Sequence, residues 1–427
     1  ETSKIMICRN CKKKIFNKIS NIGSQPISSL FPKEKKIMKN FSLNLYQCKF
    51  CDLVQLAKIP NLKDMYGPEY GYKTSVSNLM IKHLKDKINN LKKFKVLKNR
   101  SSILDIGSND GTFLNFFSNK KKNFNLYGID PSASSFLNNY KKDIKIIVDF
   151  FNKKSVEKNF LNKNIKFSLI SSYAMFYDVE DPNTFCNYIN RILEKNGVWT
   201  LEFSYFPLLL KNLTYDQICH EHCIYYSLNT FNKILLKNNL KIIDFNLNEI
   251  NGGSIELFCA KKNSKFKSNM GKIETLIDEE KKISKNDFDK FNLRIQNSKK
   301  NLILFLENNN KNKIIGYGAS TKGNVILNYC GVTNKNIHYI CDANPKKINK
   351  YTPGSFIKII SKDKMRKLKP KYLLVLIWSF RTEVIKQEEK FIKNGGKLIF
   401  PLPIFHIIDK ENYKRYLKQD FGIFSFT

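Results

Sequence analysis

The chain of 427 residues lacks an apolar run long enough to cross a membrane. Its longest apolar runs, such as residues 372–378, have the length of a strand, whereas a spanning helix needs about 20 residues. The N-terminal segment also lacks a signal-peptide core. We therefore expect no membrane association and a cytoplasmic, reducing location. In that setting the 10 cysteines are expected to be metal ligands or buried thiols and not disulfides.

Acidic residues are scarce, since 37 Asp and Glu stand against 74 Lys and Arg and give a formal charge of +37. Such a charge commonly indicates a nucleic-acid or membrane surface. Here the positive residues are mostly lysines, scattered with asparagine through every segment, and they form no arginine-rich arm. We interpret the charge as a compositional bias and do not expect nucleic-acid binding. The length predicts two or three domains.

The dinucleotide fingerprint G-x-G-x-x-G is absent, but a related loop follows the predicted strand 103–106. This loop is bracketed by two glycines, which permit a sharp turn and the close approach of a ligand. The next predicted strand ends at Asp130, whose carboxylate is suited to accept bonds from ribose hydroxyls. Because nothing in the loop would seat a pyrophosphate, the pattern favours S-adenosylmethionine (SAM) over NAD. The alternative is an ordinary strand-turn-helix with an aspartate cap. The predicted cofactor-binding residues are Asp105, Gly107, Asn109, Gly111, Asp130, Asp149 and Phe150.

Strands and helices alternate from residue 101 onward, which predicts an α/β fold with a doubly wound, mainly parallel sheet. The predicted cofactor residues all fall after strands, at the edge where such sheets bind ligands. A second strand, glycine loop and helix begin at residue 313, with Asp342 at about the Rossmann distance, so a second nucleotide is possible there. We expect an N-terminal module (1–75), a SAM-binding α/β domain (76–262), a helical linker or long bridging helix (263–312) and a C-terminal Rossmann-like domain (313–427).

Two C-x-x-C pairs, Cys8/Cys11 and Cys48/Cys51, lie in the N-terminal segment. Each pair can direct two thiolates at one tetrahedral zinc ion. No histidine or carboxylate base accompanies them, so the predicted zinc is structural. Redox-active or incidental cysteines are the alternative.

Residues 215–227 carry His220, Glu221 and His222 in a chain that holds only 5 histidines. A zinc protease would need H-E-x-x-H, and H-x-H lacks a remote third ligand, although metal binding and core packing remain alternatives. General acid-base work is favoured, because the ordinary pKa of imidazole lies near ambient pH. Attack by carbon on a sulfonium methyl needs an enolate, and this cluster suits its formation. Upstream, Tyr66, Tyr70 and Tyr72 are either packing residues or contacts to a polar substrate.

Taken in order, the motifs resemble those of the SAM-dependent sugar C-methyltransferases that act on nucleotide-linked 4-keto-6-deoxyhexoses. The resemblance covers nearly the whole chain. Its motifs are the paired C-x-x-C knuckles, YGYKTSVS, LDIGSNDGTFL, MFYDVEDP, YDQICHEHCIYYSL, NGGSIELF, GYGASTKGN and GGKLIFPLP.

The resemblance implies a zinc-bearing N-terminal module, a class I SAM methyltransferase domain and a C-terminal Rossmann-like domain that helps to hold an NDP-sugar. It implies His222 as the general base, Glu221 as its partner and Tyr72 in the active-site wall, with His220 beside them. One departure is Cys219, which stands where many members carry tyrosine. The predicted substrate-binding residues are Tyr70, Tyr72, Gly253, Ser254, Gly318, Ser320 and Lys322.

Two other functions compete with carbon methylation. An O- or N-methyltransferase of the same fold needs no enolate. A non-catalytic nucleotide-sugar or RNA-binding protein is the second alternative, although the aromatic residues form no RNP-like pattern. The sequence does not predict the oligomeric state, and a monomer is compatible with it.

Overall fold

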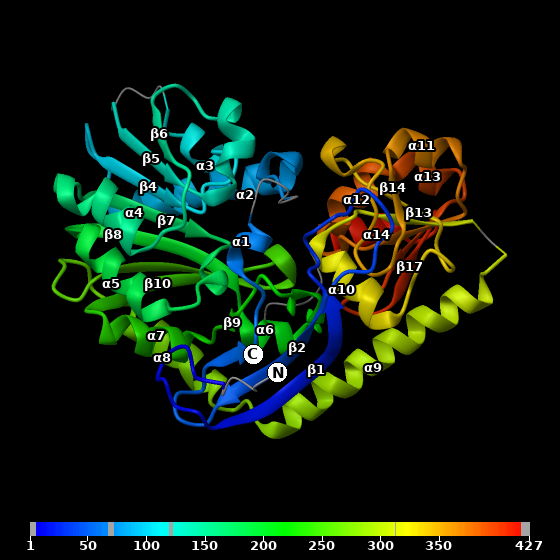
Figure 1. The fold of residues 1–427 in the computed structure, drawn as a ribbon, viewed down its shortest axis with the longest axis horizontal. Helices are drawn as coiled ribbons and strands as arrows, with labels where there is room; N and C mark the ends of the chain where they lie inside the picture. Colours follow the sequence, from blue (N-terminus) through cyan, green and yellow to red (C-terminus); the bar gives the residue numbers. More distant parts are fainter. Residues whose placement is uncertain (1–5, 67–71, 119–122, 312, 420–427) are drawn as a thin grey trace.

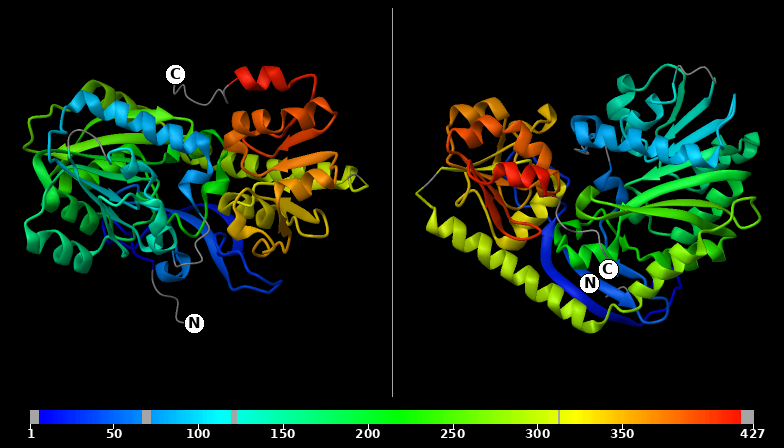
Figure 2. Two further views of the ribbon diagram at one scale, coloured as in Figure 1. Left: turned by 90° about the horizontal axis from the view of Figure 1, so that it is seen from above. Right: turned by 180° about the vertical axis from the view of Figure 1, so that it is seen from behind.

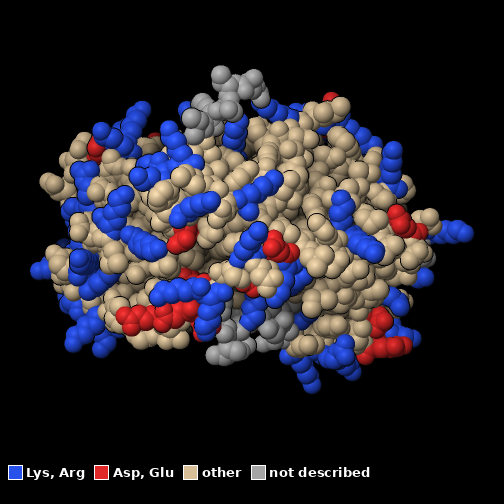
Figure 3. All heavy atoms as spheres, turned by 90° about the horizontal axis from the view of Figure 1, so that it is seen from below, with Lys and Arg blue, Asp and Glu red and all other residues tan. Residues whose placement is uncertain are grey.

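The computed structural model describes residues 6–66, 72–118, 123–311 and 313–419. Figure 1 shows two α/β units side by side, with the N-terminal strands and a long helix beneath them. None of the helices in these ranges is both long and apolar enough to cross a membrane. Lysine and arginine side chains are dispersed over the face in Figure 3, in agreement with the scattered charge of the sequence.

The central unit is built on a seven-stranded sheet in the order β10-β11-β8-β7-β4-β5-β6. All of its strand pairs are parallel except those of β11, which runs antiparallel to both of its neighbours. The strand order reverses between β4 and β7. The strands are β4 (Ser102–Ile106), β5 (Asn125–Ile129), β6 (Ile144–Ile147), β7 (Phe167–Tyr173), β8 (Leu193–Ser204), β10 (Leu240–Asn248) and β11 (Ser254–Lys261). The doubly wound sheet predicted from the alternating pattern is confirmed.

Strands β4 and β7 are buried along most of their length, as expected for central strands covered on both faces. The helices and turns around the sheet are α2 (Asn78–Leu91), η2 (Lys92–Phe94), α3 (Thr112–Asn115), η3 (Pro131–Asn139), α4 (Lys153–Asn159), η4 (Leu161–Lys163), η5 (Phe176–Asp178), α5 (Pro182–Ile192), α6 (Phe206–Lys211), η6 (Tyr215–Gln217), α7 (Leu228–Lys237), η7 (Ile250–Gly252) and α8 (Met270–Glu280).

The C-terminal unit is a six-stranded sheet in the order β14-β13-β12-β15-β16-β17, in which only β17 pairs antiparallel. Its strands are β12 (Ile314–Tyr317), β13 (Tyr339–Cys341), β14 (Lys358–Ile360), β15 (Tyr372–Val375), β16 (Lys397–Phe400) and β17 (His406–Ile408). Its helices and turns are α10 (Thr321–Cys330), η8 (Pro345–Lys347), α11 (Lys362–Lys367), η9 (Trp378–Phe380), α12 (Arg381–Gln387), α13 (Glu389–Lys393) and α14 (Tyr413–Lys418). The order again reverses between two parallel strands, here β12 and β15.

The N-terminal sheet joins segments that lie far apart in the sequence. Strands β1 (Phe16–Pro26), β2 (Asn40–Cys48) and β3 (Val54–Leu56) pair in order, after which come α1 (Leu62–Met65) and η1 (Thr74–Val76). The fourth strand, β9 (Ile224–Tyr225), belongs to the central unit and pairs with β3. The segment that carries His220 to His222 is thereby attached to the N-terminal sheet.

Helix α9 (Lys285–Asn308) runs beneath both units in Figures 1 and 2. With 24 residues it is about 36 Å long. Its Asn292 donates a 2.8 Å bond to the Ile19 carbonyl in β1, and Arg294 donates one of 3.1 Å to Leu210 in α6. Ser298 donates to the carbonyl of Pro401, which follows β16. This part of the predicted linker or bridging helix is thus a packed helix that contacts the N-terminal sheet, the central unit and the C-terminal unit.

Candidate functional site

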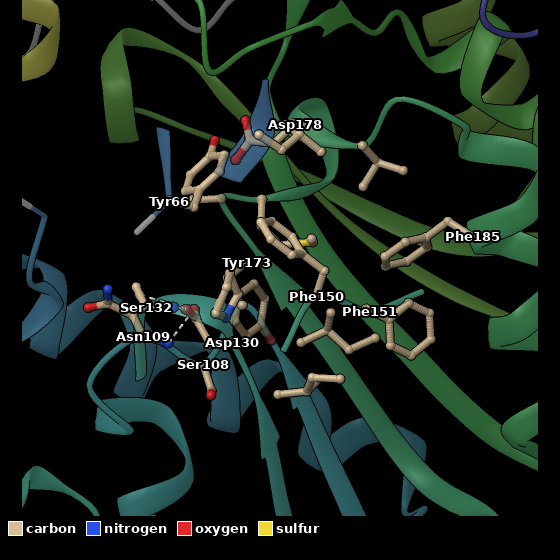
Figure 4. Close-up of a pocket in the computed structure, with 18 of the residues that line it drawn as sticks. Tyr66, Ser108, Asn109, Asp130, Ser132, Phe150, Phe151, Tyr173, Asp178 and Phe185 are labelled. Carbon is tan, nitrogen blue, oxygen red and sulfur yellow. Dashed lines mark hydrogen bonds between the residues drawn. The ribbon is translucent and has the colours of Figure 1, made fainter. Parts of the chain in front are cut away.

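A cavity of about 800 Å³ lies at the carboxyl edge of the central sheet, where the strand order reverses between β4 and β7. The loops after β4, β5, β6 and β7 form its wall, together with residues 59–63, Tyr66 and part of α2. Figure 4 shows polar side chains at one end and phenylalanines along one side. Ligands of open α/β sheets bind at such a reversal.

The loop after β4 is held by hydrogen bonds before any ligand binds. Gly107 has φ +75°, and its N–H donates to the Ile129 carbonyl at the end of β5. Asp105 accepts a 2.6 Å bond from the Ser171 hydroxyl in β7. Burial raises the pKa of Asp105 to about 7. The loop therefore brings a buried acid and a glycine backbone to the cavity wall.

Asp130 joins the loops after β4 and β5. Its Oδ2 accepts a 2.8 Å bond from the Asn109 N–H, and its Oδ1 accepts bonds from the N–H and hydroxyl of Ser132 (Figure 4). Burial raises the pKa of this carboxyl, while these donors oppose the effect. The carboxyl is therefore fixed at the cavity wall in one orientation.

Most of the predicted cofactor residues line this cavity: Asp105, Gly107, Asn109, Asp130 and Phe150. Gly111 and Asp149 are not among the described residues that line it. Gly111 begins α3 with φ +76°, and the Asp149 carboxylate accepts a 2.7 Å bond from the N–H of Phe150. Both shape the wall through the backbone.

The imidazole of His222 is buried and packs against the Tyr177 ring in a tilted arrangement, with 3.9 Å between the ring centroids and an interplanar angle of 42°. Its Nδ1 lies 2.9 Å from the Gln217 carbonyl oxygen. Because a carbonyl only accepts, Nδ1 is the protonated nitrogen and Nε2 of the neutral ring is left as the basic one. Burial, aided by the nearby charge of Lys322, lowers the pKa of His222 to about 3.

The partnership expected between Glu221 and His222 is wrong for this structure. Among the described residues, Glu221 Oε2 pairs with the Ser28 hydroxyl at 3.4 Å, and the Gln217 carbonyl holds His222 instead. Successive side chains of this irregular segment point in different directions. A backbone carbonyl that orients an imidazole leaves no signal in the residue types.

His220 faces the N-terminal sheet. Its Nε2 lies 3.1 Å from the carbonyl oxygen of Phe41 in β2, and its ring meets the Phe41 ring edge-on. Burial lowers its pKa. The expected cluster of three acid-base groups is therefore dispersed, with His220 in a packing role.

Lys322, expected near a diphosphate, lies in the contact between the two α/β units. Its Nζ donates a 2.6 Å bond to Asn251 Oδ1 in η7. Burial lowers the pKa of Lys322 to about 8, against the opposing effect of the Asp216 carboxyl. The indole of Trp378 donates a 2.8 Å bond to the same carboxyl. The edge of the C-terminal sheet is thus docked on the central unit.

Most of the remaining predicted substrate residues make structural contacts. Ser320 caps α10 by accepting a bond from Gly323 N–H, and a Cβ on Gly318 would lie 2.6 Å from Ile377. The carbonyl of Gly253 accepts the N–H of Tyr205, and Ser254 is fully buried. Tyr72 lines the cavity, and its carbonyl accepts a bond from the Asn109 side chain, whereas Tyr70 lies outside the described residues.

Two further side chains line the cavity, of which Tyr66 was predicted as a packing or substrate-contacting residue and Asp178 was missed by the sequence analysis. Tyr66 ends α1, Asp178 ends η5, and they face each other across one end of the cavity (Figure 4). The motif MFYDVEDP marked the segment of Asp178 without giving that residue a role.

The four predicted cysteine ligands come together, with all Sγ atoms within 4.8 Å of one another. The pairs Cys8/Cys51 and Cys11/Cys48 are each 3.5 Å apart. Four sulfurs at about 2.3 Å from one zinc would be separated by about 3.8 Å, so the set fits that ion. Both knuckles close with the same turn, since Cys8 and Cys48 each accept an N–H from the fourth residue onward.

Comparisons with known proteins agree with this architecture. Residues 77–244 match the family model described as a methyltransferase domain, and residues 249–403 match the C-methyltransferase C-terminal domain. The chain is 25% identical over 413 residues to the C-methyltransferase NovU of Streptomyces niveus, which covers 95% of this chain and 97% of the relative.

Solved structures similar to part of the chain include a putative sarcosine dimethylglycine methyltransferase from Galdieria sulphuraria. The two chains are 12% identical, the alignment covers 45% of this chain and 92% of that chain, and the TM-score is 0.35. A SAM-dependent methyltransferase from Clostridium acetobutylicum is also 12% identical, covers 42% and 90%, and has a TM-score of 0.33.

The central sheet with its cavity and the matched methyltransferase domain define a SAM-dependent methyltransferase. The C-terminal match and the relative that spans the whole chain are more specific. In these respects the chain is similar to C-methyltransferases that carry this C-terminal domain.

Proposed function

We propose that this enzyme methylates a carbon next to the ketone of an NDP-linked keto-deoxysugar through an enolate. SAM supplies an electrophilic methyl group when it is bound. The match of residues 249–403 to the C-methyltransferase C-terminal domain supports transfer to carbon, and the resemblance of the motifs to sugar C-methyltransferases supports the substrate class.

The cavity of the central sheet offers the groups that SAM requires. Asp130 presents a fixed carboxylate to accept ribose hydroxyls, and Gly107 allows close approach of the ligand. Phe150 and Phe151 provide apolar surface for a base (Figure 4). Cavities of roughly 300–1,000 Å³ hold ligands of this size.

The observation that carries the proposal is the state of His222. The ring is neutral at physiological pH, and its Nδ1–H is committed to the Gln217 carbonyl, so Nε2 is the available base. Tyr177, against which the ring packs, directly precedes the cavity residue Asp178. The base therefore contacts the residue that precedes a lining residue of the cavity, although His222 itself is not among the described lining residues.

A base with a pKa of about 3 is unprotonated but weak, and the charge of Lys322 is one cause of that weakness. An anionic nucleotide sugar near Lys322 would offset the charge and raise the pKa of His222. The imidazole would then gain basicity when the substrate is in place, closer to the value that general-base catalysis favours.

We also propose that the four cysteine thiols bind one structural zinc ion. The donor set is closed and entirely sulfur, with three thiols buried and Cys11 half-buried, and such sites contribute directly to folding. The ion would secure the N-terminal sheet, which pairs with β9 next to the catalytic segment.

The test incubates the enzyme with a panel of NDP-4-keto sugars in deuterated water, with and without SAM. Mass spectrometry should find a product methylated on carbon and deuterium at the alpha position. His222→Asn should lower exchange and methyl transfer by about a hundredfold to ten-thousandfold, the range for loss of a general base.

The matched control is His338→Asn, because His338 is exposed in the C-terminal unit and should be dispensable. SAM affinity should be unchanged in both variants. A product methylated on oxygen or nitrogen, or near-parent turnover by His222→Asn, would contradict the mechanism.

A further inference from the structure

The carboxyl of Asp178 occupies an unusual position for an acidic group. It lines the cofactor cavity at the end near Tyr66 (Figure 4), and its Oδ1 has no hydrogen-bond partner among the described residues. Buried acceptors without partners are rare in folded proteins, and each requires an explanation. The most direct explanation is that a ligand in the cavity forms a hydrogen bond with this carboxyl.

Burial and the groups before β9 favour the neutral form of Asp178. Glu221, Cys219 and Cys223 approach it from that segment, and none of them carries positive charge. Tyr66 approaches it from the end of α1, and its hydroxyl opposes the effect by lowering the pKa of Asp178. Burial, reinforced by the Glu221 charge, raises the pKa of Asp178 well above its ordinary value. A protonated carboxyl has a hydrogen to donate, which a carboxylate lacks.

The turn that carries Asp178 is rigid and adjoins the base. Phe176 is fully buried and packs edge-to-face on Phe185 and Trp199. The Tyr177 carbonyl accepts the N–H of Cys223, and the Tyr177 ring covers His222. The turn therefore holds the Asp178 carboxyl at the cavity wall and places the Tyr177 ring against the imidazole of His222.

We propose that Asp178, protonated and supported by Tyr66, donates a hydrogen bond to the ketone oxygen of the methyl acceptor and stabilises its enolate. The inference rests on the proposed function, and it adds Asp178 as a catalytic residue that contacts the reacting oxygen. A neutral carboxylic acid beside a phenol in an apolar site is an effective donor to an oxyanion.

The step balances as follows. The alpha proton passes to Nε2 of His222, the C–H electron pair forms the C=C bond, and the carbonyl π pair moves onto the oxygen held by Asp178. When the C=O bond is restored, the C=C electron pair would form the new bond from the alpha carbon to the methyl group of SAM. The sulfur–methyl bond would break with its electron pair passing to sulfur, so that the neutral thioether would leave. The Asp178 proton stays on its carboxyl throughout, and the net proton released is the one on His222.

The test measures alpha-proton exchange in deuterated water and methyl transfer, across pH, for Asp178→Ala and Asp178→Asn. Asp178→Ala should lose about a hundredfold to a thousandfold in both rates, as for removal of an oxyanion donor. Asp178→Asn keeps an N–H donor and should lose less. Tyr66→Phe should lose about tenfold, since it removes one supporting hydrogen bond.

The pH profile separates catalysis from a structural role. The parent should lose activity as pH rises through the pKa of Asp178, because the carboxylate cannot donate and repels the enolate. Asp178→Asn has nothing to titrate there, so this alkaline limb should disappear. Asp64→Asn, an exposed carboxyl two residues before Tyr66 and outside the cavity wall, is the matched control and should behave as the parent.

Calorimetry should show unchanged SAM affinity in the Asp178 variants, which establishes that they are folded. Parent rates in Asp178→Ala, or an alkaline limb that persists in Asp178→Asn, would overturn the assignment and leave the C-methyltransferase proposal standing. A parent enzyme that neither exchanges nor methylates any keto-sugar nucleotide would overturn both.

Discussion

The two α/β units use one backbone arrangement for opposite purposes. In the central sheet Gly107 N–H donates to the last residue of β5, and Asp130 N–H donates to Ile147. In the C-terminal sheet Gly318 N–H donates to the last residue of β13, and Asp342 N–H donates to Ile360. Both aspartates also cap the N–H two residues onward. The backbone alone therefore does not decide whether a sheet edge binds a ligand.

The side chains decide it. Asp130 offers its second oxygen to the glycine loop and borders a cavity of about 800 Å³. At the other edge Lys347 lies 3.9 Å from Asp342 and donates a 2.7 Å bond to the Ala319 carbonyl. Ile377 packs on Gly318, and Trp378 bonds to the central unit. The second edge is filled by the chain itself and serves as a contact between the two units.

The largest loss of stability should come from a change in the N-terminal module. Cys48→Ser removes one of the four ligands of the proposed zinc and should release the ion. The binding free energy of a structural zinc, about 10–16 kcal/mol, contributes directly to the folding of such modules. We expect a lower melting temperature and much less than one zinc per chain by elemental analysis. Cys330 lies outside the cluster, so the control variant Cys330→Ser should still bind zinc. A metal-free parent with the same melting temperature would contradict the site.

Truncation of the indole at the filled edge should destabilise the protein without affecting SAM. Trp378 is 1% exposed and packs against Gly252, so Trp378→Ala should cost about 3–5 kcal/mol of unfolding free energy. Chemical denaturation measures the loss, and calorimetry measures the SAM affinity. Trp378→Phe keeps most of the packing and should cost less. A fall in SAM affinity as large as the loss of stability would show that the two edges are not separate.

A smaller loss of stability should distinguish the cost of backbone strain from the cost of steric crowding beside the cavity of the central sheet. A Cβ at Gly111 would lie 2.5 Å from the Tyr140 ring, whereas at Gly23, also at positive φ, it would meet nothing within 4 Å. Gly23→Ala should cost about 1–2 kcal/mol for the left-handed backbone. Gly111→Ala should cost about 1–3 kcal/mol more for overpacking. Equal losses in denaturation experiments would mean that Tyr140 moves aside freely.

The sequence predicted the features that depend on strand ends and local spacing. Asp105 and Asp130 meet because parallel strands end at one edge, and the C-x-x-C spacing brings four thiols together. It also predicted the second glycine loop at Gly318. The periodicity that identifies such a loop does not reveal that Ile377 occupies the space beside it.

The remaining features depend on tertiary contacts between distant segments. Tyr66 and Asp178 meet only because α1 crosses the edge of the central sheet, and His222 turns toward a backbone carbonyl instead of Glu221. The hydrogen bond of Lys322 to Asn251 in η7 follows from the docking of the two units. Residue type specifies none of these orientations.

The most direct test of the account is calorimetric titration of SAM into two matched variants, Asp130→Ala and Asp342→Ala. Both remove a carboxyl that follows the second strand of its sheet and caps the residue two positions on. Asp130→Ala should weaken SAM binding by about 1.5–3 kcal/mol, the range for a lost hydrogen bond to a charged acceptor. Asp342→Ala should bind SAM like the parent. Equal affinity in all three proteins, or a loss confined to Asp342→Ala, would contradict the assignment of SAM to the central sheet.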